Sequence, residues 1–196
     1  KYNVKALGVQ CDVTNEEQIR AMVDKALAEW GKIDILVNNA GIDRMARGWE
    51  IDDADWDFVI DVTFKGVFRC IRAVFPHMVK QKSGKIVNVS SVGAWAADPT
   101  DSPMYLSAKA AVLGLTRAYA HIGAPYNINV NAVAPGFIPN PFLRKVAKEE
   151  DLERVRKMQL LDCDGKPSDI ANAIMFLSSE KASFITGETI TVNVLI

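Results

Sequence analysis

Tyr105 and Lys109 are the two side chains whose types and spacing most directly suggest chemistry. Residues four positions apart share one face of a helix. A lysine ammonium beside a phenol favours the phenolate and lowers the phenol pKa from about 10 toward neutrality. Tyr105 is therefore a candidate general acid and base near physiological pH.

Other polar or glycine-containing segments follow stretches that the sequence predicts to be strands. In a parallel α/β sheet, ligands bind outside the carboxyl ends of the strands. We therefore expect these segments to surround one site together with Tyr105 and Lys109. The segments are Asp12-Val13, Asn38-Asn39-Ala40-Gly41, Ser90-Ser91 and Pro135-Gly136-Phe137-Ile138.

Strands and helices alternate along the whole chain. Thr14 and Glu17 form the pattern of a capping box that would open a helix, and Gly31 would end it. Apolar residues at helical spacing predict further helices, and apolar runs of strand length predict strands buried on both faces. The predicted strands are 4–13, 33–37, 85–89, 128–133 and 188–194, the other helices are 53–80, 102–121 and 167–177, and a charged, mobile stretch is expected over 142–161. This alternation predicts an α/β fold: a Rossmann-like, doubly wound parallel sheet with helices on both faces, in three layers.

Composition excludes several classes of protein. The 23 Lys and Arg residues nearly balance the 24 Asp and Glu residues, which argues against a nucleic-acid surface based on bulk charge. No apolar run reaches the roughly 18 residues of a membrane helix. The three cysteines are widely spaced, and His77 and His121 lack partners at ligand spacing, so we expect no metal site and a reducing, cytoplasmic setting. Without repeats or linkers, residues 1–196 are expected to form a single domain.

Five segments, in this order, resemble the short-chain dehydrogenase/reductase family. They are NNAG (38–41), IVNVSS (86–91), YLSAK (105–109), NAVAPGFI (131–138) and ASFITGETITVN (182–193). The resemblance covers essentially the whole chain and is strongest to the family's 3-oxoacyl-carrier-protein reductases. It implies hydride transfer between NAD or NADP and a ketone or secondary alcohol.

The resemblance also implies a role for each site residue. Tyr105 would exchange the proton, Lys109 would lower its pKa and hold the nicotinamide ribose, and Ser91 would polarise the carbonyl. Ser91 is preferred to Ser90 because its fourteen-residue spacing to Tyr105 is near that of the family. Thr63 stands where the family has an asparagine that holds a water of the proton relay. The implied cofactor contacts are Asp12, Val13, Asn39, Ala40, Gly41, Tyr105, Lys109, Pro135, Gly136 and Ile138.

Several alternatives stay open. Asp12 could be an additional helix cap, and Thr63 could be an ordinary core threonine. The whole chain could be a catalytically impaired relative that keeps the fold for binding or assembly. A flavodoxin-like binding domain is a further alternative, although it does not explain YLSAK or NAVAPGFI.

The resemblance carries three more expectations. Helices 53–80 and 103–122 would pack across a two-fold axis into a homodimer or homotetramer, with Phe64, Phe68, Phe75 and Tyr119 beyond the core-facing stripe. An apolar substrate pocket would involve Trp49, Trp95, Met104 and 137–158. The family's glycine-rich phosphate turn and two strand–helix units would precede residue 1, so that 4–13 would have no neighbour and 33–37 would be an exposed edge.

Overall fold

The chain folds around a parallel sheet of four strands. The computed structural model describes residues 4–44, 48–97, 102–139 and 149–194. In these ranges the strands stand in the order β1-β2-β3-β4, and every neighbouring pair is parallel. The strands are β1 (Ile35–Asn38), β2 (Gly84–Val89), β3 (Ile128–Pro135) and β4 (Thr189–Val192).

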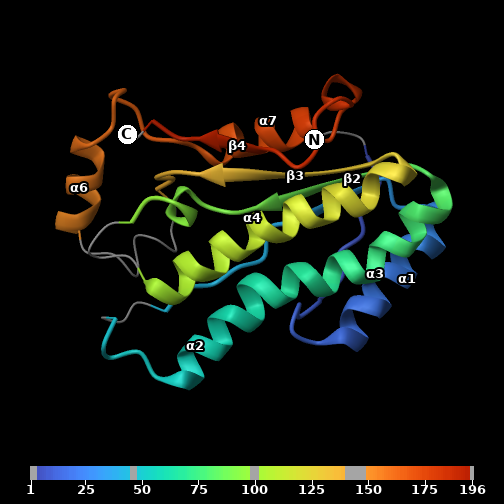
Figure 1. Ribbon diagram of the computed structural model, residues 1–196, viewed down its shortest axis with the longest axis horizontal. Helices are drawn as coiled ribbons and strands as arrows, with labels where there is room; N and C mark the ends of the chain where they lie inside the picture. The colour runs from blue at the N-terminus through green and yellow to red at the C-terminus, as the bar shows by residue number, and fades with distance from the viewer. Residues whose placement is uncertain (1–3, 45–47, 98–101, 140–148, 195–196) are drawn as a thin grey trace.

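Helices cover both faces of this sheet (Figure 1). α3 and α4 pack on one face, with α1 against α3, and α7 packs on the other. The α helices are α1 (Glu16–Trp30), α2 (Asp53–Ile60), α3 (Gly66–Gln81), α4 (Pro103–Gly123), α6 (Glu149–Lys157) and α7 (Pro167–Leu177). A π-helical turn, η1 (Asp61–Lys65), joins α2 to α3, and short 3₁₀ turns are η2 (Val92–Ala94), η3 (Ala124–Tyr126) and η4 (Glu180–Ala182). The predicted three-layer α/β fold is confirmed.

Alternating side chains of β2 divide the core into two clusters. Ile86 packs with residues of α3 and α4, whereas Val87 packs with Leu177 of α7. Successive strand residues point to opposite faces, so a strand covered on both sides is apolar throughout. This is why Ile86, Val87 and Val89 of this strand are all apolar, although they do not all point to the same face.

Two expectations for the N-terminal region are wrong. In the described ranges residues 4–13 join no sheet, because a strand needs a hydrogen-bonded neighbour and none lies beside them. The N-cap of α1 is Asn15 and not Thr14: the Asn15 carboxamide oxygen accepts hydrogen bonds from the backbone N–H groups of Glu17 and Gln18. The Thr14 hydroxyl instead donates to Asp12 Oδ1 at 2.8 Å.

β1 is an edge strand. It pairs only with β2 in the described sheet, and Ile35 and Val37 are 47% and 40% exposed. Burial on both faces was therefore the wrong expectation for this strand, whereas exposure as an edge agrees with its single neighbour.

The helical region predicted over 53–80 ends with α3 at Gln81, and Pro76 lies inside its last two turns. The stretch 142–161 contains the helix α6, while residues 140–148 lie outside the described ranges. None of the helices in the described part of the chain is long and apolar enough to cross a bilayer.

Candidate active site

Lys109 is the buried cation of the site. It lies in the second turn of α4 and is 4% exposed. Its Nζ donates to the Val89 carbonyl at 2.7 Å, and its own carbonyl accepts from Ser90 Oγ at 2.8 Å. Burial disfavours the ammonium and lowers the pKa of Lys109 to about 8.

Tyr105 lies one turn before Lys109 on the same helix. Ser102 caps α4, with its hydroxyl accepting from the Tyr105 backbone N–H, and Pro103 occupies the first turn. Lys109 Nζ is 5.5 Å from the centroid of the Tyr105 ring. The spacing of four residues therefore does bring the phenol and the ammonium together.

Gly41 lies next to both the Lys109 ammonium and Thr63. A Cβ at Gly41 would lie 3.3 Å from Lys109 Nζ and 3.6 Å from Thr63 Cγ2, so the absence of a side chain keeps this space open. Thr63 is fully buried on the π-helical turn η1, a type of turn that often occurs at functional sites. Its hydroxyl donates to the Ile42 carbonyl at 2.9 Å and accepts from the Ile42 N–H at 3.0 Å.

The structure separates the two serines that follow β2. Ser90 is 2% exposed, and its hydroxyl is bonded to helix α4. Ser91 is partly exposed, and its hydroxyl accepts from the Gly93 N–H at 3.2 Å. A Cβ at Gly93 would lie within 3.5 Å of both Ser91 Oγ and the Leu106 side chain, so Ser91 lies beside the residue that follows Tyr105. Of the two serines, Ser91 is the more exposed.

Asp12 and Val13 lie directly before Thr14 and Asn15, in the segment that leads into α1. Val13 packs against Gly66, the first residue of α3, where a Cβ would come within 2.7 Å of Val13 Cγ2. Asp12 is exposed, and hydrogen bonds from the Thr14 N–H and hydroxyl lower the pKa of its carboxyl group. Asp12 thus helps to order the turn before α1, while its carboxylate remains open to solvent.

The remaining predicted cofactor contacts lie at the ends of β1 and β3. Asn39 and Ala40 are exposed directly after β1. Pro135 ends β3, and the Gly136 N–H donates to the Val192 carbonyl at 3.0 Å. Ile138 lies against Gly165, where a Cβ would come within 2.5 Å of Ile138 Cδ1. All of these residues share the carboxyl edge of the parallel sheet with Ser91.

One buried network was missed by the sequence analysis. Asn38 Nδ2 donates to Asn88 Oδ1 at 2.8 Å, and Asn88 Nδ2 donates to Thr116 Oγ1 at 2.9 Å. These bonds connect β1, β2 and α4 just below the site. The available signal was the presence of Asn38 and Asn88 at or near the ends of apolar strands, because buried amides require partners.

The residues predicted to line an apolar substrate pocket do not all reach the surface. Met104 is fully buried, so it does not face an open pocket. Trp95, directly after η2, is 55% exposed, and Trp49 is 81% exposed. Part of the range 137–158 lies outside the described residues.

A nicotinamide cofactor fits the donor set at this edge. Lys109 and Tyr105 offer hydrogen-bond donors suited to ribose hydroxyls, and Gly41 offers exposed backbone without a side chain. No group of three or more His, Cys, Asp or Glu side chains in the described ranges could hold a metal ion.

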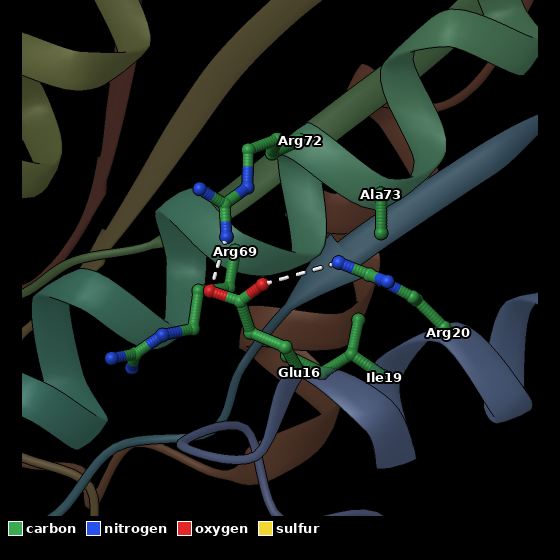
Figure 2. Close-up of a pocket in the computed structure, with 6 residues that line it drawn as sticks. All are labelled: Glu16, Ile19, Arg20, Arg69, Arg72 and Ala73. Carbon is green, nitrogen blue, oxygen red and sulfur yellow. Dashed lines mark hydrogen bonds and ion pairs between the residues drawn. The ribbon is translucent and has the colours of Figure 1, made fainter.

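A surface pocket of about 230 Å³ lies elsewhere, between α1 and α3 (Figure 2). Glu16 lies at its centre and pairs with Arg72 at 2.5 Å and with Arg20 at 3.5 Å. Arg69 pairs with Asp61 at 2.8 Å. The pocket therefore belongs to a set of ion pairs that joins two helices, and it does not include Tyr105 or Lys109.

Comparisons with known proteins identify the family of this chain. Residues 1–194 match a family model described as enoyl-(acyl carrier protein) reductase. The 3-oxoacyl-[acyl-carrier-protein] reductase of Thermotoga maritima is 43% identical over 185 residues, which cover 93% of this chain and 73% of that protein. Among solved structures, a Brucella melitensis 3-oxoacyl-[acyl-carrier protein] reductase with bound NAD has a TM-score of 0.87 at 34% identity, covering 96% of this chain and 70% of that one. A structure of ElxO with bound NADP has a TM-score of 0.85 at 35% identity, covering 93% and 75% of the two chains. The chain belongs to the short-chain dehydrogenase/reductase family of NAD(P)-dependent oxidoreductases.

Proposed function

We propose that this protein interconverts a ketone and a secondary alcohol, with Tyr105 as the general acid and base. The observation that carries the proposal is the position of the Lys109 ammonium: it is buried, and it lies 5.5 Å from the Tyr105 ring centroid. A cation in a site of low dielectric stabilises the phenolate and so lowers the phenol pKa toward the working pH.

Each side chain then has one task. Bound NAD or NADP supplies or accepts the hydride. During reduction, Tyr105 gives its phenolic proton to the carbonyl oxygen, and the Ser91 hydroxyl donates a hydrogen bond to the same oxygen. Lys109 stabilises the resulting phenolate. Thr63 stands where the family has the asparagine of the proton relay, and its hydroxyl would take that place in the relay. In oxidation the same proton moves in the opposite direction.

We assign cofactor binding to the loops at the carboxyl edge of the sheet. Asp12 and Val13 would hold the adenosine end, and the backbone of Asn39, Ala40 and Gly41 would lie beneath the cofactor. Tyr105 and Lys109 would bond the nicotinamide ribose. The residues proposed to face the nicotinamide ring are Pro135, Gly136 and Ile138.

The test is Tyr105→Phe, which keeps the ring and removes the proton. Turnover should fall by about 10²–10⁴-fold, with a smaller effect on cofactor affinity. The measurement is steady-state reduction of a panel of ketones with NADH and NADPH, beside cofactor titration by fluorescence. A Tyr105→Phe variant that keeps the parent's turnover would show that Tyr105 is not the proton donor.

A second candidate is a catalytically impaired protein that keeps the fold for binding or assembly. The observation that favours it is the Thr63 hydroxyl, which already bonds both backbone groups of Ile42 and leaves little capacity for a relay water. Cofactor binding without turnover on any ketone of the panel would support this candidate. Thr63→Asn should then raise activity only if a water site for the relay exists.

The substrate class follows from the exposed aromatic residues and the named relative. Trp95 and Trp49 offer apolar surface, which suits a substrate with an apolar body. Because the Thermotoga maritima relative is named as a 3-oxoacyl-[acyl-carrier-protein] reductase, 3-oxoacyl thioesters are the first substrates to test.

We also propose a single domain over residues 1–196, a homodimer or homotetramer, and a cytoplasmic location. Cys11, Cys70 and Cys163 are all free thiols, which is usual in a reducing compartment. Phe75 is buried in the chain's own core, whereas Phe64, Phe68 and Tyr119 are only partly buried, so these three remain the proposed contributors to the assembly surface.

A further inference from the structure

Two consecutive residues at the end of β2 hold one lysine at two points. The Val89 carbonyl accepts a hydrogen bond from Lys109 Nζ at 2.7 Å. The Ser90 hydroxyl donates to the backbone carbonyl of Lys109 at 2.8 Å. The side chain and the main chain of Lys109 are thus both tied to the same strand end.

The Ser90 hydroxyl is well placed to set the distance between the sheet and the helix. Its own backbone N–H donates to the Val133 carbonyl of β3 at 2.8 Å, so the sheet fixes its position. Ser90 is 2% exposed, which protects the bond to α4 from competition with water. A helical carbonyl has a second lone pair, so it accepts this bond in addition to its bond within the helix.

We propose that Ser90 is a positioning residue for the Tyr105–Lys109 pair. Its hydroxyl holds α4 at the distance from β2 at which Lys109 Nζ reaches Val89 and remains against the Tyr105 ring. The catalytic consequence rests on the proposed function, whereas the effect on Lys109 itself does not.

The surroundings of Lys109 make this effect measurable. In the described ranges the groups placed at its ammonium are the Val89 carbonyl on β2, the Tyr105 ring on α4 and the backbone of Gly41, which also lies next to Thr63 of η1. Tyr105 is the titratable group among them, and no carboxylate in the described ranges pairs with Lys109. Loosening α4 would admit water and favour the charged form of the lysine.

The experiment compares Ser90→Ala and Ser90→Cys with Ser107→Ala. Cysteine keeps a side-chain atom at the γ position, although a larger one, and is only a weak donor, so an effect shared by both variants reports the hydrogen bond. It also serves if the alanine variant does not fold. Ser107 is exposed on the same helix, two residues before Lys109, and is the matched control. Acetylation of Lys109 by a trace of acetic anhydride is followed by peptide mass spectrometry from pH 6 to 11. The midpoint of the pH dependence reports the titration of the amine, and the limiting rate at high pH reports its accessibility.

In the parent and in Ser107→Ala, the acetylation midpoint should lie near the Lys109 pKa of about 8. In both Ser90 variants it should rise by about one pH unit, and the limiting acetylation rate should rise about three-fold, because water reaches the amine. If turnover is found, kcat should fall about ten-fold in both Ser90 variants, and the basic limb of its pH profile should move upward by the same interval.

Folded Ser90 variants that label like the parent would overturn the proposal, whether or not the protein turns over any ketone. Altered labelling with unchanged kcat in an active parent would overturn the catalytic role of the positioning. A parent without turnover would count against the proposed function alone, because the labelling result still decides the role of Ser90.

Discussion

The buried Lys109 links the site to the stability of the fold. Its pKa is lowered by burial from 10.5 to about 8, so between these pH values the unfolded chain binds a proton that the folded chain does not. The free energy of unfolding should therefore rise with pH across this window, by about 3 kcal/mol in total. Below pH 8 the lysine is charged in both states, and its burial is a constant cost.

Lys109→Met provides the comparison that isolates this contribution. Cys70 opposes it, because burial raises the pKa of that thiol from 9.0 to about 11 and stability is lost as the unfolded thiol ionises. The difference between parent and Lys109→Met cancels the Cys70 effect. In urea unfolding at several pH values, the free energy of unfolding of the parent should increase relative to that of Lys109→Met from pH 8 to 10.5. Parallel curves would contradict the burial of a charged lysine.

The buried Thr63 hydroxyl is a second single group whose contribution to stability can be measured. Thr63→Val keeps the shape and removes the hydroxyl that bonds both Ile42 backbone groups. We expect a loss of about 1–3 kcal/mol, because the partly buried N–H and carbonyl of Ile42 lose their partner. Thermal unfolding measures the loss, and Thr63→Ser, which keeps the hydroxyl, is the control. If valine is tolerated as well as serine, the Ile42 bonds contribute nothing measurable.

At the scale of elements, Gly66 sets how segment 4–13 meets α3. Glycine to alanine inside an exposed helix normally stabilises by roughly 0.5–1 kcal/mol. At Gly66 the added Cβ would come within 2.7 Å of Val13 Cγ2, so this clash makes the change in stability unfavourable. We expect Gly66→Ala to destabilise by about 1–3 kcal/mol.

The double variant Gly66→Ala with Val13→Ala checks that cause. Removing the valine methyl groups makes room for the new Cβ. The loss of stability in the double variant should therefore be smaller than the sum of the losses in the two single variants. Additive losses in thermal unfolding would mean that the two residues do not meet.

At the scale of the whole molecule, the proposed assembly can be tested at Gly114. Gly114 lies in the middle of α4, and a Cβ there would meet no atom of the described residues within 4 Å apart from its chain neighbours and the backbone of its own helix. Such a position allows the close approach of another helix. Gly114→Leu should therefore leave the fold of the subunit intact and dissociate the oligomer, because the new side chain fills the space of the partner.

Light scattering measures the mass of the assembly in solution directly. The parent should have two or four times the mass of its own subunit, and Gly114→Leu should have a lower mass at the same concentration. Gly114→Ala controls for the change in helix propensity. A parent with the mass of one subunit would contradict the assembly, and an unchanged mass for Gly114→Leu would place the interface elsewhere.

Local sequence patterns predicted the kinds of elements and their order. Helix periodicity located α4 at the predicted range 102–121 and α7 at the predicted range 167–177, because this signal depends on neighbours a few residues away. The same locality explains why the spacing of Tyr105 and Lys109 was sufficient to place them on one helix face. The fold class and the pairing of the two reactive groups thus followed from the sequence alone.

The tertiary structure decided which partners each group has. It buried Lys109 against Val89 and thereby lowered its pKa, and it turned Ser90 toward α4 and left Ser91 accessible. It also left residues 4–13 outside the sheet and joined Asn38 and Asn88 through a buried bond. Burial, dielectric surroundings and strand pairing arise from residues far apart in the chain, so no pattern within one segment contains them.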